Sequence, residues 1–249
     1  MMTYHTGLVS ISFRKHSAEE LVCAAKETGI TAIEWGSDVH VPAGDIQRAV
    51  QVKQLCVDSG IAMPEYGSYY YLGLEPESFD GVLACARTLG TSRIRVWGGK
   101  KPSDSLQTAD YEVLVADARR ICDMAPDMLI CLECHKNSVT DEYHTALRFL
   151  KDVERPNLRM FWQPHQYRDL RYNLDALKAL APFIESVHVF SWDRERKFPL
   201  ECMEEDWLQY LQLLKAAGVE NYMLEFMHDN SVESLPQTAK TLKTWLEQE

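Results

Sequence analysis

Hydrophobic and polar positions follow a repeating order along this chain: a short apolar run, a polar turn, and a segment with apolar residues at helical spacing. The pattern predicts strands at 7–13, 31–35, 61–66, 93–97, 128–134, 158–163, 184–190 and 222–226. It predicts helices at 17–28, 45–59, 76–89, 109–124 and 204–217, and others starting near 140, 173 and 231. Ser17 and Glu20 have the spacing of a capping box at the first helix, and Ser231 is expected to cap the last.

Eight strand–helix units, of about 31 residues each, match a right-handed βαβ crossover repeated around a closed barrel. An open doubly wound sheet is the alternative, but it usually has a glycine-rich turn after its first strand, where this chain reads SFRKHS. No linker, low-complexity segment or composition break marks a second domain. We therefore predict an α/β fold with a single (β/α)8 TIM barrel over residues 1–249.

Strand parity selects four polar residues in the second half of the chain. Alternation places Glu133 and His188 on the face opposite their apolar neighbours, and Glu225 likewise when Tyr222, Leu224 and Phe226 face the helices. Gln163 ends its strand just before a proline. Such inward residues near the carboxyl ends of barrel strands build active sites.

Glu133, Gln163, His188 and Glu225 should therefore lie at equivalent heights on successive strands. Two carboxylates, an imidazole and an amide oxygen suit a divalent ion such as Mn²⁺, Mg²⁺, Co²⁺ or Zn²⁺. A single inward Glu or His is more often a paired core residue, but four on adjacent strands favour a metal.

Other polar and aromatic residues lie on or just beyond the predicted strands. Glu34 and Arg95 both face inward, where they either neutralise each other or bind substrate. The further substrate-binding candidates, placed where a sugar would meet rings and hydrogen-bond donors, are Arg14, Asp38, His40, Trp97, His135, Trp162 and His165.

The charge and composition narrow the class of partner. The chain has 46% hydrophobic residues and a net charge of −11, which opposes binding to nucleic acid and favours a small-molecule substrate. No apolar run is long enough to span a membrane and the first residues lack the layout of a secretory signal, so we expect a cytoplasmic protein. The seven cysteines are an odd number scattered along the chain, which favours reduced core thiols over a disulfide framework. Cys131 and Cys134 have C-x-x-C spacing, but on a strand they would face opposite sides, which disfavours a redox or zinc role.

Several stretches make the whole chain resemble the sugar phosphate isomerase/epimerase superfamily, the xylose isomerase-like barrels that also include endonuclease IV. They are FRKHSAEELVCAAKETGITAIEWGSDVHVP, YGSYYYLG, IRVWGG, LECHKNSVTD, WQPHQ, VHVFSW, PLECMEEDW and LEF. The resemblance implies a divalent metal held after strands five to eight, by Glu133, Gln163, His188 and Glu225. Gln163 departs from the commoner Asp, which removes one negative charge from the ligand set.

The resemblance also implies an activity: isomerisation or epimerisation of a small sugar or keto-polyol through an enediolate. The two glutamates would exchange a proton beside a carbonyl, while His135 and Arg95 would orient the substrate. A lyase, of the inosose or dehydroshikimate dehydratase type, is the alternative on the same barrel. A nuclease and a non-catalytic sugar-binding barrel are further alternatives, and a homo-oligomer is left open.

Overall fold

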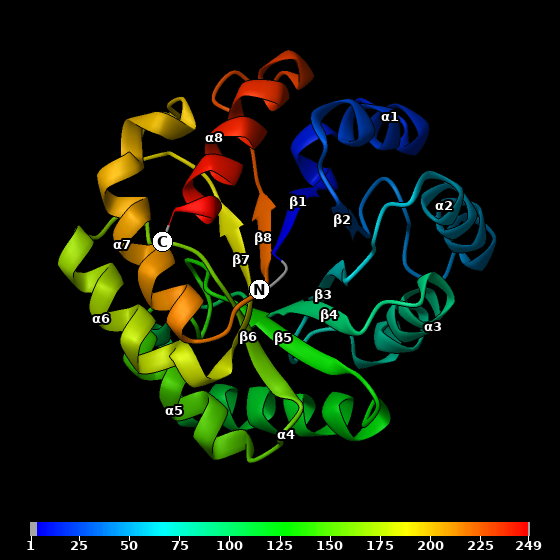
Figure 1. The fold of residues 1–249 in the computed structure, drawn as a ribbon. Helices are drawn as coiled ribbons and strands as arrows, with labels where there is room; N and C mark the ends of the chain where they lie inside the picture. Colours follow the sequence, from blue (N-terminus) through cyan, green and yellow to red (C-terminus); the bar gives the residue numbers. More distant parts are fainter. Residues whose placement is uncertain (1–3, 249) are drawn as a thin grey trace.

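The strands close into a parallel barrel, as the repeating pattern predicts. The computed structural model describes residues 4–248, and its eight helices surround the strands (Figure 1). The strands are β1 (His5–Val9), β2 (Ala32–Gly36), β3 (Glu65–Tyr71), β4 (Arg93–Trp97), β5 (Leu129–Glu133), β6 (Leu158–Trp162), β7 (Ile184–Val189) and β8 (Asn221–Leu224). Each pairs in parallel with the next, and β8 pairs with β1.

The helices follow the strands in turn. They are α1 (Ala18–Thr28), α2 (Ile46–Ser59), α3 (Phe79–Leu89), α4 (Thr108–Met124), α5 (Tyr143–Val153), α6 (Leu170–Leu180), α7 (Glu204–Ala216) and α8 (Leu235–Glu247). Ser17 and Glu20 form the predicted capping box. Ser231 instead caps a 3-10 turn, Val232–Ser234, that precedes α8. Among residues 4–248 no helix is both long and apolar enough to cross a membrane.

Two predicted strands differ most in their bounds from the strands of the structure. β3 begins at Glu65, directly after Pro64, and continues through the tyrosines to Tyr71. Proline has no N–H to donate to a sheet, whereas tyrosine favours strands. β1 ends at Val9, because Ser10–Phe13 form a 3-10 turn whose Ser10 hydroxyl accepts a hydrogen bond from the Gly36 N–H.

The main apolar core lies between the strands and the helices. It includes Ile94 and Val96 of β4, and Tyr222 and Leu224 of β8. Inside the barrel only Val9, Ile11, Ala32 and Met223 form a small buried apolar cluster among the described residues. The interior also holds the buried charged and polar side chains of Glu34, Glu65, Arg95, Glu133 and His188, which can carry chemistry.

Candidate active site

The four residues selected by strand parity converge at the carboxyl ends of β5 to β8. Glu133 ends β5, Gln163 follows β6, His188 lies near the end of β7, and Glu225 follows β8. None of the four is more than 6% exposed. One ligand atom each from Glu133, His188 and Glu225 lie within 4.8 Å of one another. The predicted convergence is therefore present.

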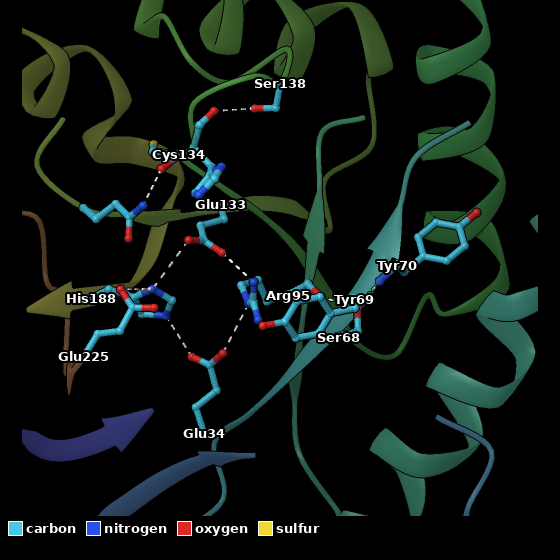
Figure 2. A network of polar contacts seen from close by, with 12 residues as sticks. Glu34, Ser68, Tyr69, Tyr70, Arg95, Glu133, Cys134, Ser138, His188 and Glu225 are labelled. Carbon is cyan, nitrogen blue, oxygen red and sulfur yellow. Dashed lines mark hydrogen bonds and ion pairs between the residues drawn. The ribbon is translucent and has the colours of Figure 1, made fainter. Parts of the chain in front are cut away.

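The His188 ring is held by one nitrogen and free at the other. Its Nε2 lies 2.8 Å from Glu34 Oε2, while its Nδ1 lies 3.9 Å from Glu133 Oε1 and 3.8 Å from Glu225 Oε2 (Figure 2). Nδ1 has no hydrogen-bond partner among the described residues. Burial lowers the pKa of His188, but the surrounding carboxylates outweigh burial and raise the pKa to about 10. A proton on Nδ1 and a divalent cation would compete for the same position.

The Gln163 amide, like the His188 ring, has one polar atom that is hydrogen-bonded and one that is not. Its Nε2 donates a 2.8 Å hydrogen bond to the Cys134 carbonyl, which orients the side chain. Its Oε1 is buried without a hydrogen-bond partner in the described chain. Buried polar atoms are rarely left unpaired. Gln163 Oε1, His188 Nδ1 and the two glutamates therefore fit a divalent ion as a mixed oxygen and nitrogen ligand set.

Arg95 connects two of the buried acids. Its Nε donates to Glu34 Oε1 at 3.2 Å and its Nη1 to Glu133 Oε2 at 2.6 Å (Figure 2). Burial opposes charge on Arg95 and on Glu34, but the ion pairs raise the pKa of Arg95 and lower that of Glu34. The predicted mutual neutralisation of Glu34 and Arg95 is thus present.

Gly67 on β3 makes room for this ion pair. A Cβ at position 67 would lie 2.3 Å from Glu34 Oε1 and 3.0 Å from Arg95 Nη2. The first distance is too short for a side chain and the second is tight, so a residue other than glycine would displace the Glu34 carboxylate.

A fourth buried acid, Glu65, lies deeper in the barrel. Its Oε1 accepts a 2.9 Å hydrogen bond from the Ser186 hydroxyl, and its Oε2 has no partner among the described residues. Burial raises the pKa of Glu65 to about 8, so this carboxyl is mostly neutral at pH 7. Burial likewise raises the pKa of Glu225, to about 7.

A cavity of about 440 Å³ opens above these groups. The predicted site residues on its wall are Arg14, Arg95, Trp97, Glu133, His135, Gln163 and Glu225. Trp97 stacks on Tyr71, with ring centroids 5.5 Å apart, and meets the His135 ring edge to face at 4.3 Å. This volume accommodates a monosaccharide-sized molecule.

The remaining predicted substrate-binding residues do not line this cavity. Glu34 is fully buried beneath it, and Asp38 pairs with Arg14 at 2.5 Å. His40 is turned to the His16 carbonyl at 3.0 Å. Trp162 packs outward on Trp207 and Tyr210, and His165 lines a neighbouring cavity of about 290 Å³.

Several residues on the wall were not among the predicted site residues. They are Ile11, Tyr69, Tyr71, Gly99, Lys100, Lys136, Asn137, Gln166, Trp192 and Phe226. Tyr69 and Tyr71 could have been found from the i, i+2 spacing of inward strand residues, had β3 been extended to Tyr71. Phe226 was predicted to face the helices, which is wrong, because it lines the cavity. β8 ends at Leu224, and Phe226 has a left-handed backbone, φ 47°, that ends the alternation.

A closed parallel barrel with acids, an imidazole and an amide at its carboxyl-end face defines the chain as a barrel enzyme whose site suits a divalent metal. The family model for the xylose isomerase-like TIM barrel matches residues 22–248. The chain belongs to this family, as the sequence resemblance indicated.

Known relatives include enzymes. A 3-dehydroshikimate dehydratase of Bacillus anthracis is 25% identical over 195 residues, which are 73% of this chain and 70% of that protein. Among solved structures, the probable 3-DHS dehydratase AsbF from Bacillus anthracis has a TM-score of 0.81 at 21% identity and covers 97% of this chain and 99% of its own. The chain is accordingly an enzyme of this barrel family.

Two further structures share the fold. A xylose isomerase-like protein from Mycobacterium smegmatis, solved in complex with magnesium, has a TM-score of 0.78 at 12% identity, covering 98% of this chain and 97% of its own. The 3-keto-D-glucoside 4-epimerase YcjR from E. coli has a TM-score of 0.73 at 13% identity, covering 97% of this chain and 100% of its own.

Proposed function

We propose that this chain is a divalent-metal-dependent isomerase or epimerase that moves a proton at a carbon next to a carbonyl of a small sugar or keto-polyol. One observation carries the proposal. Glu133 and Glu225, which line the 440 Å³ cavity, approach the unpartnered Nδ1 of His188 at 3.9 and 3.8 Å. Two carboxylates on either side of a substrate can act as base and acid.

Glu133, Gln163, His188 and Glu225 are the residues that would hold the metal. A bound divalent cation would supply Lewis-acid polarisation of the substrate carbonyl. Glu225 would take or return the proton, because its buried carboxylate lines the cavity beside His188. Glu133 would serve the other face, held by its 2.6 Å contact with Arg95.

The walls of the cavity support a sugar-sized substrate. The rings of Tyr71 and Trp97 offer flat apolar faces, and His135 and Arg95 offer hydrogen-bond donors beside Glu133. Aromatic rings commonly pack on the apolar faces of ligands, while a few polar groups orient them.

A lyase is the second candidate, because the curated relative at 25% identity is a dehydratase. Elimination of water also begins with removal of a proton beside a carbonyl, so the same glutamates would serve. The decisive step would be departure of a hydroxyl group from the adjacent carbon.

Solvent deuterium exchange tests the shared first step. Ketoses and keto-polyols are incubated with the Mn²⁺-loaded protein in D2O and followed by NMR. Exchange at the carbon beside the carbonyl is the expected result, and its absence for every compound would overturn the proposal. For a compound that exchanges, mass spectrometry separates the two candidates: an isomer keeps the substrate mass, whereas a dehydration product is one water lighter.

A further inference from the structure

Two lysines that line the 440 Å³ cavity form no ion pair with a carboxylate in the described part of the chain. Lys100 lies on the loop after β4 and Lys136 on the loop after β5, and both are exposed. Lys100 Nζ lies 4.2 Å from the centroid of the Tyr71 ring, and Lys136 Nζ lies 3.5 Å from the Tyr167 hydroxyl. Among residues 4–248 no carboxylate oxygen lies within 4.0 Å of either ammonium group. Both positive charges therefore remain available to a ligand.

Neighbouring cations are balanced by acids. Lys101, next in sequence to Lys100, pairs with Asp110 at 2.8 Å. Arg14, also on the cavity wall, pairs with Asp38, and Arg95 is neutralised by Glu34 and Glu133. Unpaired lysines are often only solvated surface groups, but these two sit on the wall of one cavity, in a chain whose net charge is −11.

The two ends of the cavity thus differ in chemistry. The floor holds the carboxylates of Glu133 and Glu225, both buried, and the rim holds Lys100 and Lys136. Tyr71 and Trp97 also line the cavity, where their rings stack on each other and Lys100 Nζ lies against the ring of Tyr71. A molecule whose carbonyl is bound at the floor would present its opposite end to the lysines.

We propose that the substrate carries an anionic group, a carboxylate or a phosphate, at the end away from its reacting carbonyl, and that Lys100 and Lys136 bind this group. The assignment of the carbonyl to the floor rests on the proposed function. The binding of the anion does not, because it follows from the two unpaired charges on the cavity wall.

Three ketoses that differ only at carbon 6 provide the test: D-fructose, D-fructose 6-phosphate and D-fructuronate. Their binding to the Mn²⁺-loaded protein is measured by calorimetry. We expect at least one anionic ketose to bind roughly tenfold or more tightly than fructose. Comparing the affinities of D-fructose 6-phosphate and D-fructuronate shows whether the site prefers a phosphate or a carboxylate.

Substitutions locate the source of that preference. Lys100→Met and Lys136→Met should each reduce a tenfold preference about threefold, and the double variant about tenfold, which abolishes it. Lys101→Met, which removes a neighbouring lysine that already has a carboxylate partner, should leave it unchanged. All four proteins should unfold at the same temperature, because the lysines are exposed.

Two outcomes would overturn the inference. One is the absence of any anion preference in the unmodified protein, and the other is a preference that survives in the double variant, since the metal alone would then account for it. Anion preference without solvent deuterium exchange would retain the inference and overturn the proposed function. Deuterium exchange on neutral ketoses without any anion preference would retain the proposed function and overturn the inference.

Discussion

Glu34 Oε2 lies 2.8 Å from Nε2 of His188, although the two residues are 154 positions apart in the chain. This contact turns the other ring nitrogen, Nδ1, toward Glu133 and Glu225. Histidines that bind metals usually have their second nitrogen hydrogen-bonded to a carboxylate or carbonyl, which orients the ring. Glu34 is therefore a positioning residue beneath the cavity and not part of its wall.

Glu34→Gln should weaken divalent metal binding about 10- to 100-fold. The amide oxygen can still accept a hydrogen bond from His188, but the negative charge that supports the ring is lost. Titration with Mn²⁺, followed by calorimetry, measures the change. Glu65→Gln is the matched control, because Glu65 is also buried in the barrel but is mostly neutral at pH 7. Equal losses in both variants would contradict the role given to Glu34.

Glu225→Gln should lower the rate of solvent deuterium exchange by about 10²- to 10⁴-fold while the fold is kept. The amide has nearly the same shape as the carboxyl but cannot take up the proton. The rate is measured by NMR at saturating Mn²⁺, so that loss of metal does not contribute. A Glu225→Gln variant with the unmodified rate would rule out the two-carboxylate mechanism.

Gly67→Ala should destabilise the protein by about 1–3 kcal/mol. The new methyl group would lie 2.3 Å from Glu34 Oε1 and would displace the ion pair with Arg95. Denaturant unfolding measures the free energy. The same substitution in a Glu34→Ala background should cost less, because the colliding carboxylate is gone. Additive effects in that double-mutant cycle would exclude the collision as the cause.

Glu65→Gln should make stability less dependent on pH. Burial raises the pKa of Glu65 from an ordinary value of 4.5 to about 8, so the folded state binds this proton more tightly than the unfolded state. Its contribution is full below pH 4.5 and is lost as the pH rises through 8. The variant should therefore match the unmodified protein near pH 4.5 and exceed it by a few kcal/mol near pH 8. Thermal unfolding of both proteins is measured from pH 4.5 to pH 8. If Glu65 does not cause the pH dependence, the unfolding temperatures of the two proteins would change with pH in parallel.

Gln163→Leu should lower Mn²⁺ affinity about tenfold, because it removes the buried Oε1 that has no protein partner in the described chain. It also removes the hydrogen bond to the Cys134 carbonyl. Gln163→Asn keeps the amide but moves its oxygen, because the side chain is one methylene shorter. This variant therefore tests whether the position of the amide oxygen matters as well as its presence. Unchanged Mn²⁺ affinity in Gln163→Leu would remove Gln163 from the ligand set.

The barrel and its inward acids could be predicted from the sequence because both depend on local periodicity. Alternation along β5 and β7 placed Glu133 and His188 inside, since side chains on a strand point to opposite faces. The same rule failed at Phe226, where the left-handed backbone ends the alternation and brings the ring into the cavity wall. A backbone change of this kind leaves no signal in the pattern of apolar residues.

Residues beyond strand ends were harder to place, because loop direction depends on contacts distant in sequence. His40 turns away to the His16 carbonyl, and Trp162, one residue before the inward Gln163, packs on α7 through Trp207. The contact of Glu34 with His188 was also missed, because it joins strands that are not neighbours in the barrel and periodicity does not show which inward residues meet. The proposed roles of Glu34, His40 and Trp162 in substrate binding stay predictions.

The groups at the floor of the cavity and those at its rim belong to different parts of the chain. Glu133, His188 and Glu225 lie on or next to strands of the closed barrel, whereas Lys100 and Lys136 lie on connecting loops. Loops tolerate substitution and insertion better than strands do. Changes in the two rim loops could therefore redirect this enzyme to new substrates over evolution while the reacting groups keep their positions, and the same division makes the loops the natural targets for engineering specificity.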